Sequence, residues 1–374
     1  MEAQTLPDAL KMIMKEEGWS QARLAREMGV LTTWVSRVVK GQRDTSVGNA
    51  IALLGRVGYE VAIRRKTEGA EVKRRGFLAG MASVTLVPSA NGNPYRDSEY
   101  VGLLSERVRG SLHGSGGITA LQDAAKHLRR VQSIVTDSKD TRLLTAASSL
   151  AREVALVHYD ARNFPLAQQA GQLSASYAQA AGDHGGRVTA LCVLATVHGY
   201  QGDGRRNEHY ARQALTVPEI SPAQEADAWM NLGGGLGLLN EKRHASIALD
   251  RAREIVADLP DSQHASLTAN VGLLLYKQGS WKAAQDALGE AVKGVSSESP
   301  WLGAYIMARR VQAALNASQP LLAAELMMPL ARVAPLVSSA RLDERLSEIS
   351  KLSLPWKDVP EVKTMREQLR VLQT

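Results

Sequence analysis

The fold of the N-terminal part of the chain is decided by the stretch GWSQARLAREMGVLTTWVSRVVKG, residues 18–41. Ser20 is a favoured N-cap, and the apolar residues that follow it recur at helical spacing on one face: Leu24, Ala25 and Met28. Gly29 supplies a tight turn before a second short helix that starts near Thr32. The stretch therefore predicts a helix-turn-helix.

The second helix of this motif divides into an inner and an outer face. Val35, Val38 and Val39 recur at the spacing of a buried face. The outer face and the N-terminal end then carry Thr32, Thr33, Trp34, Ser36 and Arg37. A recognition helix offers such positions to the major groove of DNA. The alternative is a helical hairpin in a larger core, with a solvated arginine.

The motif resembles the XRE family, the Cro/C1-repressor type of helix-turn-helix. The matching residues are Ser20-Gln21, Leu24-Ala25, Met28-Gly29-Val30, Val35-Ser36-Arg37 and Lys40-Gly41. The resemblance implies that Thr32, Thr33 and Arg37 face base edges, whereas Gln21, Lys40 and Arg43 contact phosphates. Trp34 departs from the small or polar residue often found at its position, and two roles stay open for it: covering a thymine methyl or lying against the sugar edge.

Length and charge suggest a DNA-binding module at one end of a larger protein. The 374 residues suffice for two or three domains. Residues 1–75 hold fourteen Lys or Arg against nine Asp or Glu, so they supply five of the seven net positive charges. A basic module beside a nearly neutral body fits binding of double-stranded DNA.

Several classes of protein are disfavoured by what the sequence lacks. Cys192 is the only cysteine, so neither a disulfide framework nor a usual zinc site is expected. Walker loops, nucleophile elbows and HExxH motifs are absent, which predicts no enzyme and no cofactor. No apolar run reaches the roughly 18 residues of a membrane span. We therefore expect a cytoplasmic protein that is not bound to membranes.

Four regions are predicted: a helix-turn-helix domain at 1–66, a linker at 67–95, a helical repeat domain at 96–340 and capping helices at 341–374. The linker contains Lys73-Arg74-Arg75-Gly76-Phe77-Leu78 and an apolar run that ends at Pro88. This segment imitates a twin-arginine export signal, but its place after a DNA-binding module disfavours export. The alternative is a hinge helix packed on the next domain.

Residues 59–65 alternate apolar and polar side chains with the period of a strand. A lone strand needs a partner for its edges, and the same strand of a second subunit is the simplest one. We therefore predict a homodimer through these residues. An extended linker that alternates by chance is the competing interpretation.

The body of the chain repeats. Gln278-Gly279-Ser280-Trp281-Lys282-Ala283-Ala284 resembles the turn between the two helices of a tetratricopeptide repeat, and residues 240–245 resemble it one unit earlier. The equivalent turns are separated by 40, 38, 39 and 39 residues, and their anchors are Arg162, Gly202, Asn240, Gly279 and Ser318. A constant period of this size marks an α-solenoid, so the chain as a whole is predicted to be all-α with one short strand. The resemblance covers about residues 140–335.

The concave face of such an array is lined by the first helix of each hairpin. Counting nine residues back from each anchor gives Glu153, Val193, Asn231, Asn270 and Arg309. Asn231 and Asn270 could clamp the backbone amides of a peptide, and Arg309 its carboxylate; a structural role for both asparagines is the alternative. Other concave positions carry Tyr276, Lys277 and Gln312, and Gly233–Gly235 with Gly237 form either a floor for the ligand or a close helix contact.

A helix-turn-helix joined to such repeats resembles the RRNPP regulators, which implies a short signalling peptide on the concave face, as in quorum sensing. The predicted function is therefore a DNA-binding transcriptional regulator, expected to be a repressor, whose repeats sense a peptide and alter DNA binding. Two alternatives stay open: a repressor that needs no ligand, and a DNA-anchored scaffold whose repeats bind a partner protein.

Overall fold

The computed structural model describes residues 2–3, 5–40, 50, 53–54, 57, 59, 62–63, 84–85, 93–136, 138–295 and 299–372. The chain divides into two compact units, Met1–Asp97 and Ser98–Thr374. Each unit is described by itself below. Arg43 and nearly all of the segment that imitates an export signal lie outside the described residues.

The N-terminal unit contains the predicted helix-turn-helix. Helix α1 spans Leu6–Glu16, α2 spans Gln21–Met28 and α3 spans Thr32–Val39. The Ser20 side chain accepts a hydrogen bond from the Arg23 N–H and so caps α2. Gly29 ends α2 with a φ of 66°, a left-handed conformation that favours glycine, and thereby makes the turn into α3.

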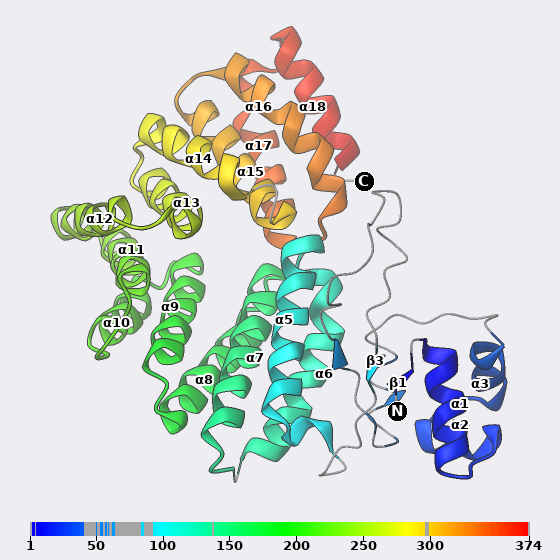
Figure 1. The fold of residues 1–374 in the computed structure, drawn as a ribbon. Helices are drawn as coiled ribbons and strands as arrows, with labels where there is room; N and C mark the ends of the chain where they lie inside the picture. The colour runs from blue at the N-terminus through cyan, green and yellow to red at the C-terminus, as the bar shows by residue number, and fades with distance from the viewer. Residues whose placement is uncertain are drawn as a thin grey trace. The chain divides into compact units, whose positions relative to one another are not determined.

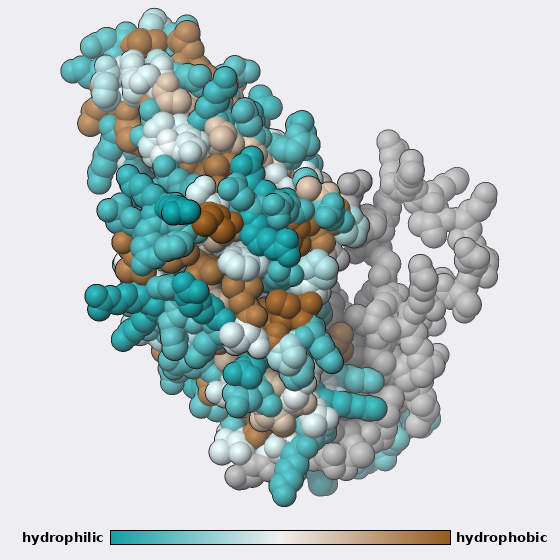
Figure 2. All heavy atoms as spheres, turned by 90° about the vertical axis from the view of Figure 1, so that its left-hand side faces the viewer, coloured by the Kyte–Doolittle hydropathy of each residue, from teal (hydrophilic) through white to brown (hydrophobic). Residues whose placement is uncertain are grey.

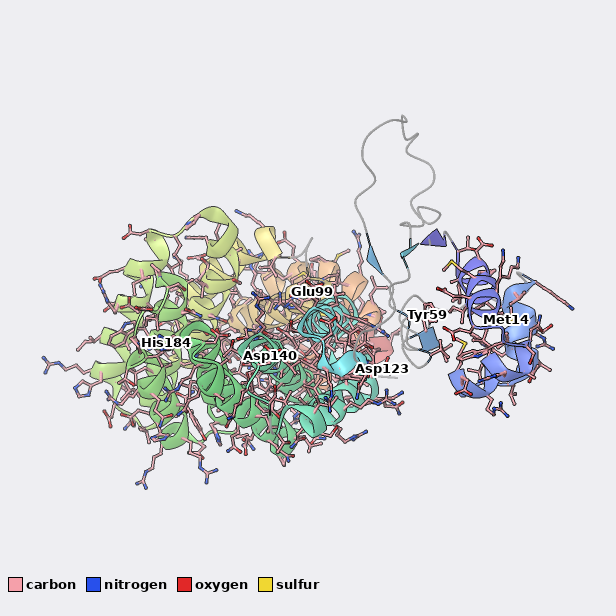
Figure 3. The ribbon with its side chains drawn as sticks, turned by 60° about the horizontal axis from the view of Figure 1, so that its bottom comes forward. Met14, Tyr59, Glu99, Asp123, Asp140 and His184 are labelled. Atoms are coloured by element: carbon pink, nitrogen blue, oxygen red, sulfur yellow. The ribbon has the colours of Figure 1, made fainter. Side chains whose placement is uncertain are left out.

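The three helices share a small core. Its largest fully buried side chains are Leu10, Ile13, Leu24, Met28 and Leu54. Met14 of α1 is partly buried against this core (Figure 3). The inward faces predicted for α2 and α3 are confirmed, because Leu24, Met28, Val35 and Val38 are less than a tenth exposed and Val39 packs against the same core while partly buried.

The short strand has a different partner from the predicted one. Strand β2, Ala62–Ile63, pairs antiparallel with β3, Val84–Thr85, and β3 also pairs with β1, Glu2–Ala3. The strand order is β1-β3-β2. The prediction that this strand pairs with a second subunit is therefore wrong for the pairing seen here, since the same chain supplies a partner. A homodimer stays a prediction.

The second unit is a TPR-like helical solenoid. It begins with α5, Ser98–Ser115, and α6, Gly117–Val135. The hairpins that follow are α7 and α8, Thr141–Asp160 and Phe164–Ala181; α9 and α10, His184–Tyr200 and Gly204–Leu215; α11 and α12, Pro222–Leu238 and Lys242–Ala257; α13 and α14, Asp261–Lys277 and Trp281–Val295; α15 and α16, Pro300–Asn316 and Pro320–Val333; α17 and α18, Ala340–Leu352 and Pro360–Leu372. Small residues at the helix contacts let neighbouring helices pack closely.

The five predicted turn anchors adopt one conformation. Their φ angles are all positive, at 59°, 81°, 62°, 77° and 59° for Arg162, Gly202, Asn240, Gly279 and Ser318. After each anchor, the next N–H donates to the carbonyl five residues earlier, as from Ser280 to Leu275. This is the Schellman arrangement that ends a helix. The period seen in the sequence therefore corresponds to a repeated backbone structure.

The solenoid curves until its ends meet (Figure 1). The C-terminal end of α7 contacts the beginnings of α15 and α17, because the Asp160 carboxylate accepts hydrogen bonds from the Trp301 indole and the Ser339 hydroxyl. Beside this contact, His113 Nδ1 of α5 lies 2.9 Å from Ser299 Oγ, which caps α15. The inner helices consequently surround a common space.

The outer surface is mixed in character. On the face shown in Figure 2, hydrophobic side chains lie in small groups among hydrophilic ones. Exposed apolar side chains of α11 and α12 include Leu238 and Ile247. Within the described residues, no helix combines the length and the hydropathy that crossing a membrane requires.

Candidate functional site

Helix α3 presents polar side chains to solvent. Thr32, Thr33, Arg37 and Lys40 are exposed, and Gln21 and Ser36 are half-buried. Arg37 has no ion pair within the described residues, and its side chain is exposed to solvent. The structure thus brings together every predicted DNA-contacting residue that it describes, and Arg43 lies outside the described residues.

Trp34 and Leu31, which lie at the start of α3, differ in exposure. Trp34 is half-buried and packs against the core of the N-terminal unit, so its ring is only partly exposed to solvent. Leu31, the residue before α3, is 76% exposed. No role was predicted from the sequence for Leu31, which stands at the N-cap position of α3 and makes no side-chain capping hydrogen bond.

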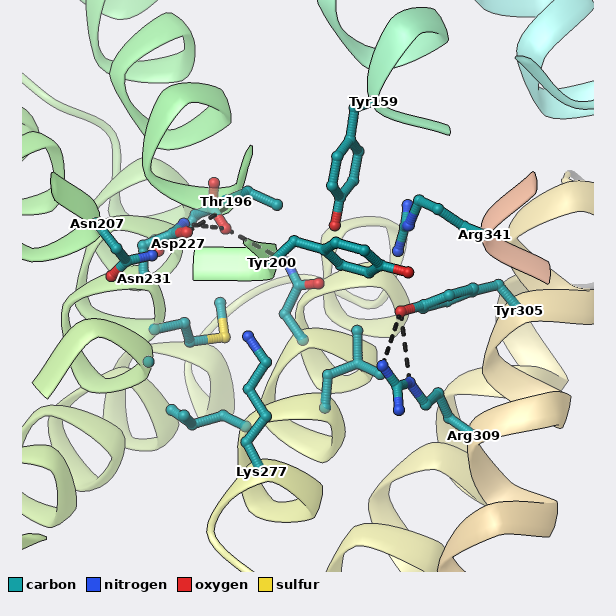
Figure 4. Close-up of a pocket in the computed structure, with 15 residues that line it drawn as sticks. Tyr159, Thr196, Tyr200, Asn207, Asp227, Asn231, Lys277, Tyr305, Arg309 and Arg341 are labelled. Atoms are coloured by element: carbon teal, nitrogen blue, oxygen red, sulfur yellow. Dashed lines mark hydrogen bonds between the residues drawn. The ribbon is translucent and has the colours of Figure 1, made fainter. Parts of the chain in front are cut away.

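The inner helices of the solenoid enclose a pocket of about 110 Å³, which we call the central hollow. Its lining comes from six inner helices and from α10. The lining residues are Tyr159, Thr196, Tyr200, Asn207, Asp227, Met230, Asn231, Gly234, Asn270, Leu273, Leu274, Lys277, Tyr305, Arg309 and Arg341. Figure 4 shows Tyr159, Tyr200, Lys277 and Arg341 pointing from different helices into the same space.

One wall of the central hollow is a network around Asp227. Asn231 Nδ2 donates to the Asp227 carbonyl at 2.9 Å, and Asn270 Nδ2 donates to Asp227 Oδ1 at 3.3 Å. Thr196 Oγ1 donates to Asn231 Oδ1. Burial raises the pKa of Asp227 to about 6, although Cys192 and Asn270 lower it by hydrogen bonding. Both predicted asparagines therefore lie in the hollow, but each already donates a hydrogen bond within the protein.

The opposite wall consists of tyrosines and arginines. Arg341 lies over the rings of Tyr159 and Tyr305, 4.0 and 4.1 Å from their centroids. Burial raises the pKa of the Tyr305 phenol, but Arg309, Arg341 and Arg345 together lower it more, to about 7. The Tyr305 hydroxyl therefore accepts hydrogen bonds from Arg309 as a strongly polarised phenol.

The remaining predicted contacts divide into lining and supporting residues. Arg309 and Lys277 line the hollow. Tyr276 does not line it, since its ring packs edge-on against Trp281 and under the Arg309 guanidinium. Gln312 is fully buried and bonds to Arg309, Arg345 and Glu348, so the expectation that it contacts a ligand is wrong for this structure. Its amide orients the charged side chains instead.

The glycines of α11 serve both of the roles that were weighed. A methyl group on Gly233 would lie 3.0 Å from Leu274 and one on Gly235 2.8 Å from the backbone nitrogen of Glu208, so both permit close helix contacts. Gly234 lines the central hollow, and nothing lies within 4 Å of a methyl group added there. Only Gly234 fits the predicted floor for a ligand.

Helix α17 supplies residues that sequence reasoning missed. The segment from 341 was predicted to cap the array, yet α17 packs beside α15 as a further inner helix, and Arg341 lines the hollow. Tyr200 of α9 donates a hydrogen bond to Glu344, which also pairs with Arg162 and Arg345. A signal was present, because one more period beyond Arg309 leads to Glu348, in the middle of α17.

No group of three or more His, Cys, Asp or Glu that could hold a metal ion occurs in the described part of the chain. Comparison with models of protein families gives no match, and neither does comparison with curated proteins. Among solved structures, the chain is similar to the one titled "Crystal Structure of Rap Protein Complexed with Competence and Sporulation Factor". That similarity has 14% identity and a TM-score of 0.45, and it covers 75% of this chain and 74% of the other.

Proposed function

We propose that the protein is a sequence-specific DNA-binding regulator. The observation that carries the proposal is the exposure of Thr32, Thr33 and Arg37 on α3, directly after the left-handed turn at Gly29. A turn of this kind sets the second helix of the motif at the angle that lets it enter the major groove. Arg37 is suited to pair with a guanine, and Lys40 and Gln21 to contact phosphates. A homodimer bound to a two-fold operator forms part of the proposal.

The second part of the proposal is that the solenoid senses a short peptide in the central hollow. Side chains of both apolar and polar character line the hollow, as in other ligand sites. Asn231 and Asn270 stand one repeat apart on its wall and could exchange their bonds with Asp227 for bonds to a peptide. A ligand that contacts several inner helices favours one curvature of the solenoid, which alters DNA binding through a population shift.

The experiment is a measurement of affinity for DNA upstream of the protein's own gene at fixed salt. It is made with and without the low-molecular-weight fraction of a dense culture of the source cells. A tenfold change, about 1.4 kcal/mol, supports a diffusible effector. Specific binding that the fraction leaves unchanged supports a ligand-independent repressor or a scaffold for a partner protein. Absence of specific DNA binding overturns the proposal.

A further inference from the structure

The charges that line the central hollow do not balance. Three cationic side chains line it, Lys277, Arg309 and Arg341, against one carboxylate, Asp227, and the Tyr305 phenol, whose pKa of about 7 gives it part of a negative charge at neutral pH. Because burial raises the pKa of Asp227 to about 6, its negative charge is also held at an energetic cost. The hollow therefore has an excess of positive charge in a space that protein surrounds.

Lys277 is the clearest unpaired cation. Its ammonium group makes no hydrogen bond or ion pair within the described residues, although the side chain extends into the hollow (Figure 4). Desolvation lowers the pKa of Lys277, the charge of Tyr305 raises it, and the charges of Arg309 and Arg341 lower it. The Lys277 side chain is exposed, so its ammonium group is reachable from solvent and free to accept an anionic partner.

Arg341 is the second cation of the central hollow that lacks a carboxylate partner among the described residues. Only 6% of this residue is exposed, and its Nε has no hydrogen-bond partner. It makes no ion pair with any carboxylate in the described ranges, and three tyrosine rings surround its guanidinium. Two neighbouring arginines differ in this respect. Arg345 pairs with Glu344 and Glu348, and Arg309 bonds to Tyr305 and Gln312.

We infer that the central hollow binds a carboxylate group between Lys277 and Arg341. The hydroxyl group of Tyr159 lies on the same lining and can donate a further hydrogen bond. A volume of about 110 Å³ suits a small acidic group better than a whole peptide. The carboxylate belongs either to a free small acid or to the C-terminus of the peptide, so the inference deepens the proposed function and rests on its sensing part.

Binding there would join distant parts of the solenoid. Lys277 ends α13, whereas Arg341 begins α17, two hairpins further along the chain. An anion held by both cations replaces their mutual repulsion with attraction to a shared partner. The closed curvature of the solenoid would thus be stabilised most when the hollow is occupied.

The test is thermal unfolding of the full chain with succinate, trialanine or trialanine amide, each compared with chloride at equal ionic strength. We expect a saturable rise of the unfolding midpoint with succinate or trialanine, and none with the amide, which lacks the carboxylate. A response to succinate alone indicates a free acid, and a response to trialanine alone indicates a peptide terminus. The inference is overturned if neither carboxylate raises the midpoint more than chloride does.

The decisive variant is Lys277→Gln. Because it removes one of the two cations that would hold the carboxylate, we expect it to lose the response to the carboxylate. Lys282→Gln, at an exposed position of the outer helix α14, is the matched control and should keep the response. A full response in Lys277→Gln contradicts the inference. DNA affinity without effector, measured on the wild type and on Lys282→Gln, is a separate readout, so failure here is distinguishable from failure of the DNA-binding proposal.

Discussion

The Trp301 indole donates a hydrogen bond of 2.7 Å to Oδ1 of Asp160, a fully buried carboxylate 141 residues earlier in the chain. The same carboxylate accepts hydrogen bonds from the Ser339 hydroxyl at 2.6 Å and from the Gly117 N–H at 2.8 Å. One side chain at the end of α7 therefore holds the beginnings of α6, α15 and α17. A buried charge with three donors is satisfied, and it becomes costly when a donor is removed.

Replacing Trp301 with Phe tests this contact. The ring remains, but the N–H is lost, so we expect the free energy of unfolding to fall by about 1.5–3 kcal/mol, the usual worth of a hydrogen bond to a charged group. Urea unfolding measures the change. Trp281→Phe is the control, because that indole nitrogen makes no hydrogen bond within the described residues. Equal losses in both variants would contradict a special role for Asp160.

The raised pKa of Asp227, about 6, makes stability depend on pH. The folded protein holds this proton more tightly than the unfolded chain, whose value is 3.8, so stability is lost as the pH rises through 6. Asp227→Asn removes the charge and keeps the acceptor oxygen for Asn270. We expect the free energy of unfolding of the variant to rise relative to that of the wild type between pH 4 and pH 8, by up to about 3 kcal/mol.

Unfolding midpoints across this pH range give the comparison for Asp227. Asp286→Asn, at an exposed position of α14, is the matched control and should follow the wild type at each pH. If the unfolding midpoints of Asp227→Asn and the wild type differed by the same amount at every pH, ionisation of Asp227 would not affect stability.

Tyr305 should ionise near neutral pH. Its pKa of about 7 lies below the ordinary value of 10, so this phenol contributes stability that is present at high pH and is lost as the pH falls through 7. The absorbance of tyrosinate, followed from pH 6 to pH 9, should show one early titration. Tyr305→Phe should abolish it, and Tyr177→Phe should not, since burial raises the pKa of Tyr177. A titration that survives in Tyr305→Phe must belong to another residue.

Two substitutions on the proposed DNA-binding module are expected to affect DNA binding in different ways. Arg37→Ala is expected to cost about 1–3 kcal/mol on the preferred sequence and to relax discrimination at one base pair. Lys40→Ala is expected to weaken all sequences alike and to reduce the salt slope by about 1. Binding to a randomised DNA pool at several salt concentrations separates them. Identical profiles for both variants would contradict the assigned contacts.

Gly234→Ala should block the hollow without harming the fold. There is room for its methyl group, and alanine favours a helix over glycine by up to about 1 kcal/mol, so the unfolding midpoint should not fall. The response to the effector should weaken, because this methyl group extends into the hollow. Gly237→Ala also has room but does not line the hollow, and it should keep the response. A normal response in Gly234→Ala would exclude this floor as a contact.

Local patterns predicted much of the fold. Ser20 and Gly29 act on residues next to them, so their capping and turning roles follow from the sequence. The period of the anchors likewise predicted backbone conformation, even at the non-glycine residues Arg162 and Asn240. Each of these features depends on a few neighbouring residues, and a sequence records such neighbours directly.

Contacts between distant repeats were not predictable in the same way. Period alone places Gln312 on an inner helix, but only the curvature of the whole array buries it against α17. The same curvature brings Arg341 to Tyr159, 182 residues earlier in the chain. Small rotations accumulate from one repeat to the next, so the closure depends on all of them together.

The carboxylate of Asp160 also bears on how the protein unfolds. In an open array each repeat contacts only its neighbours, so the ends fray first and unfolding proceeds from one end to the other. Here the first hairpin is fastened to the last two across 141 and 179 residues. Unfolding of either end of the array breaks the hydrogen bonds of Asp160 and so removes contacts from the other end too. Forming these hydrogen bonds during folding requires closure of a very long loop. We therefore expect the repeats to unfold in one cooperative step and to fold slowly, unlike the repeats of an open array, which unfold progressively from the ends.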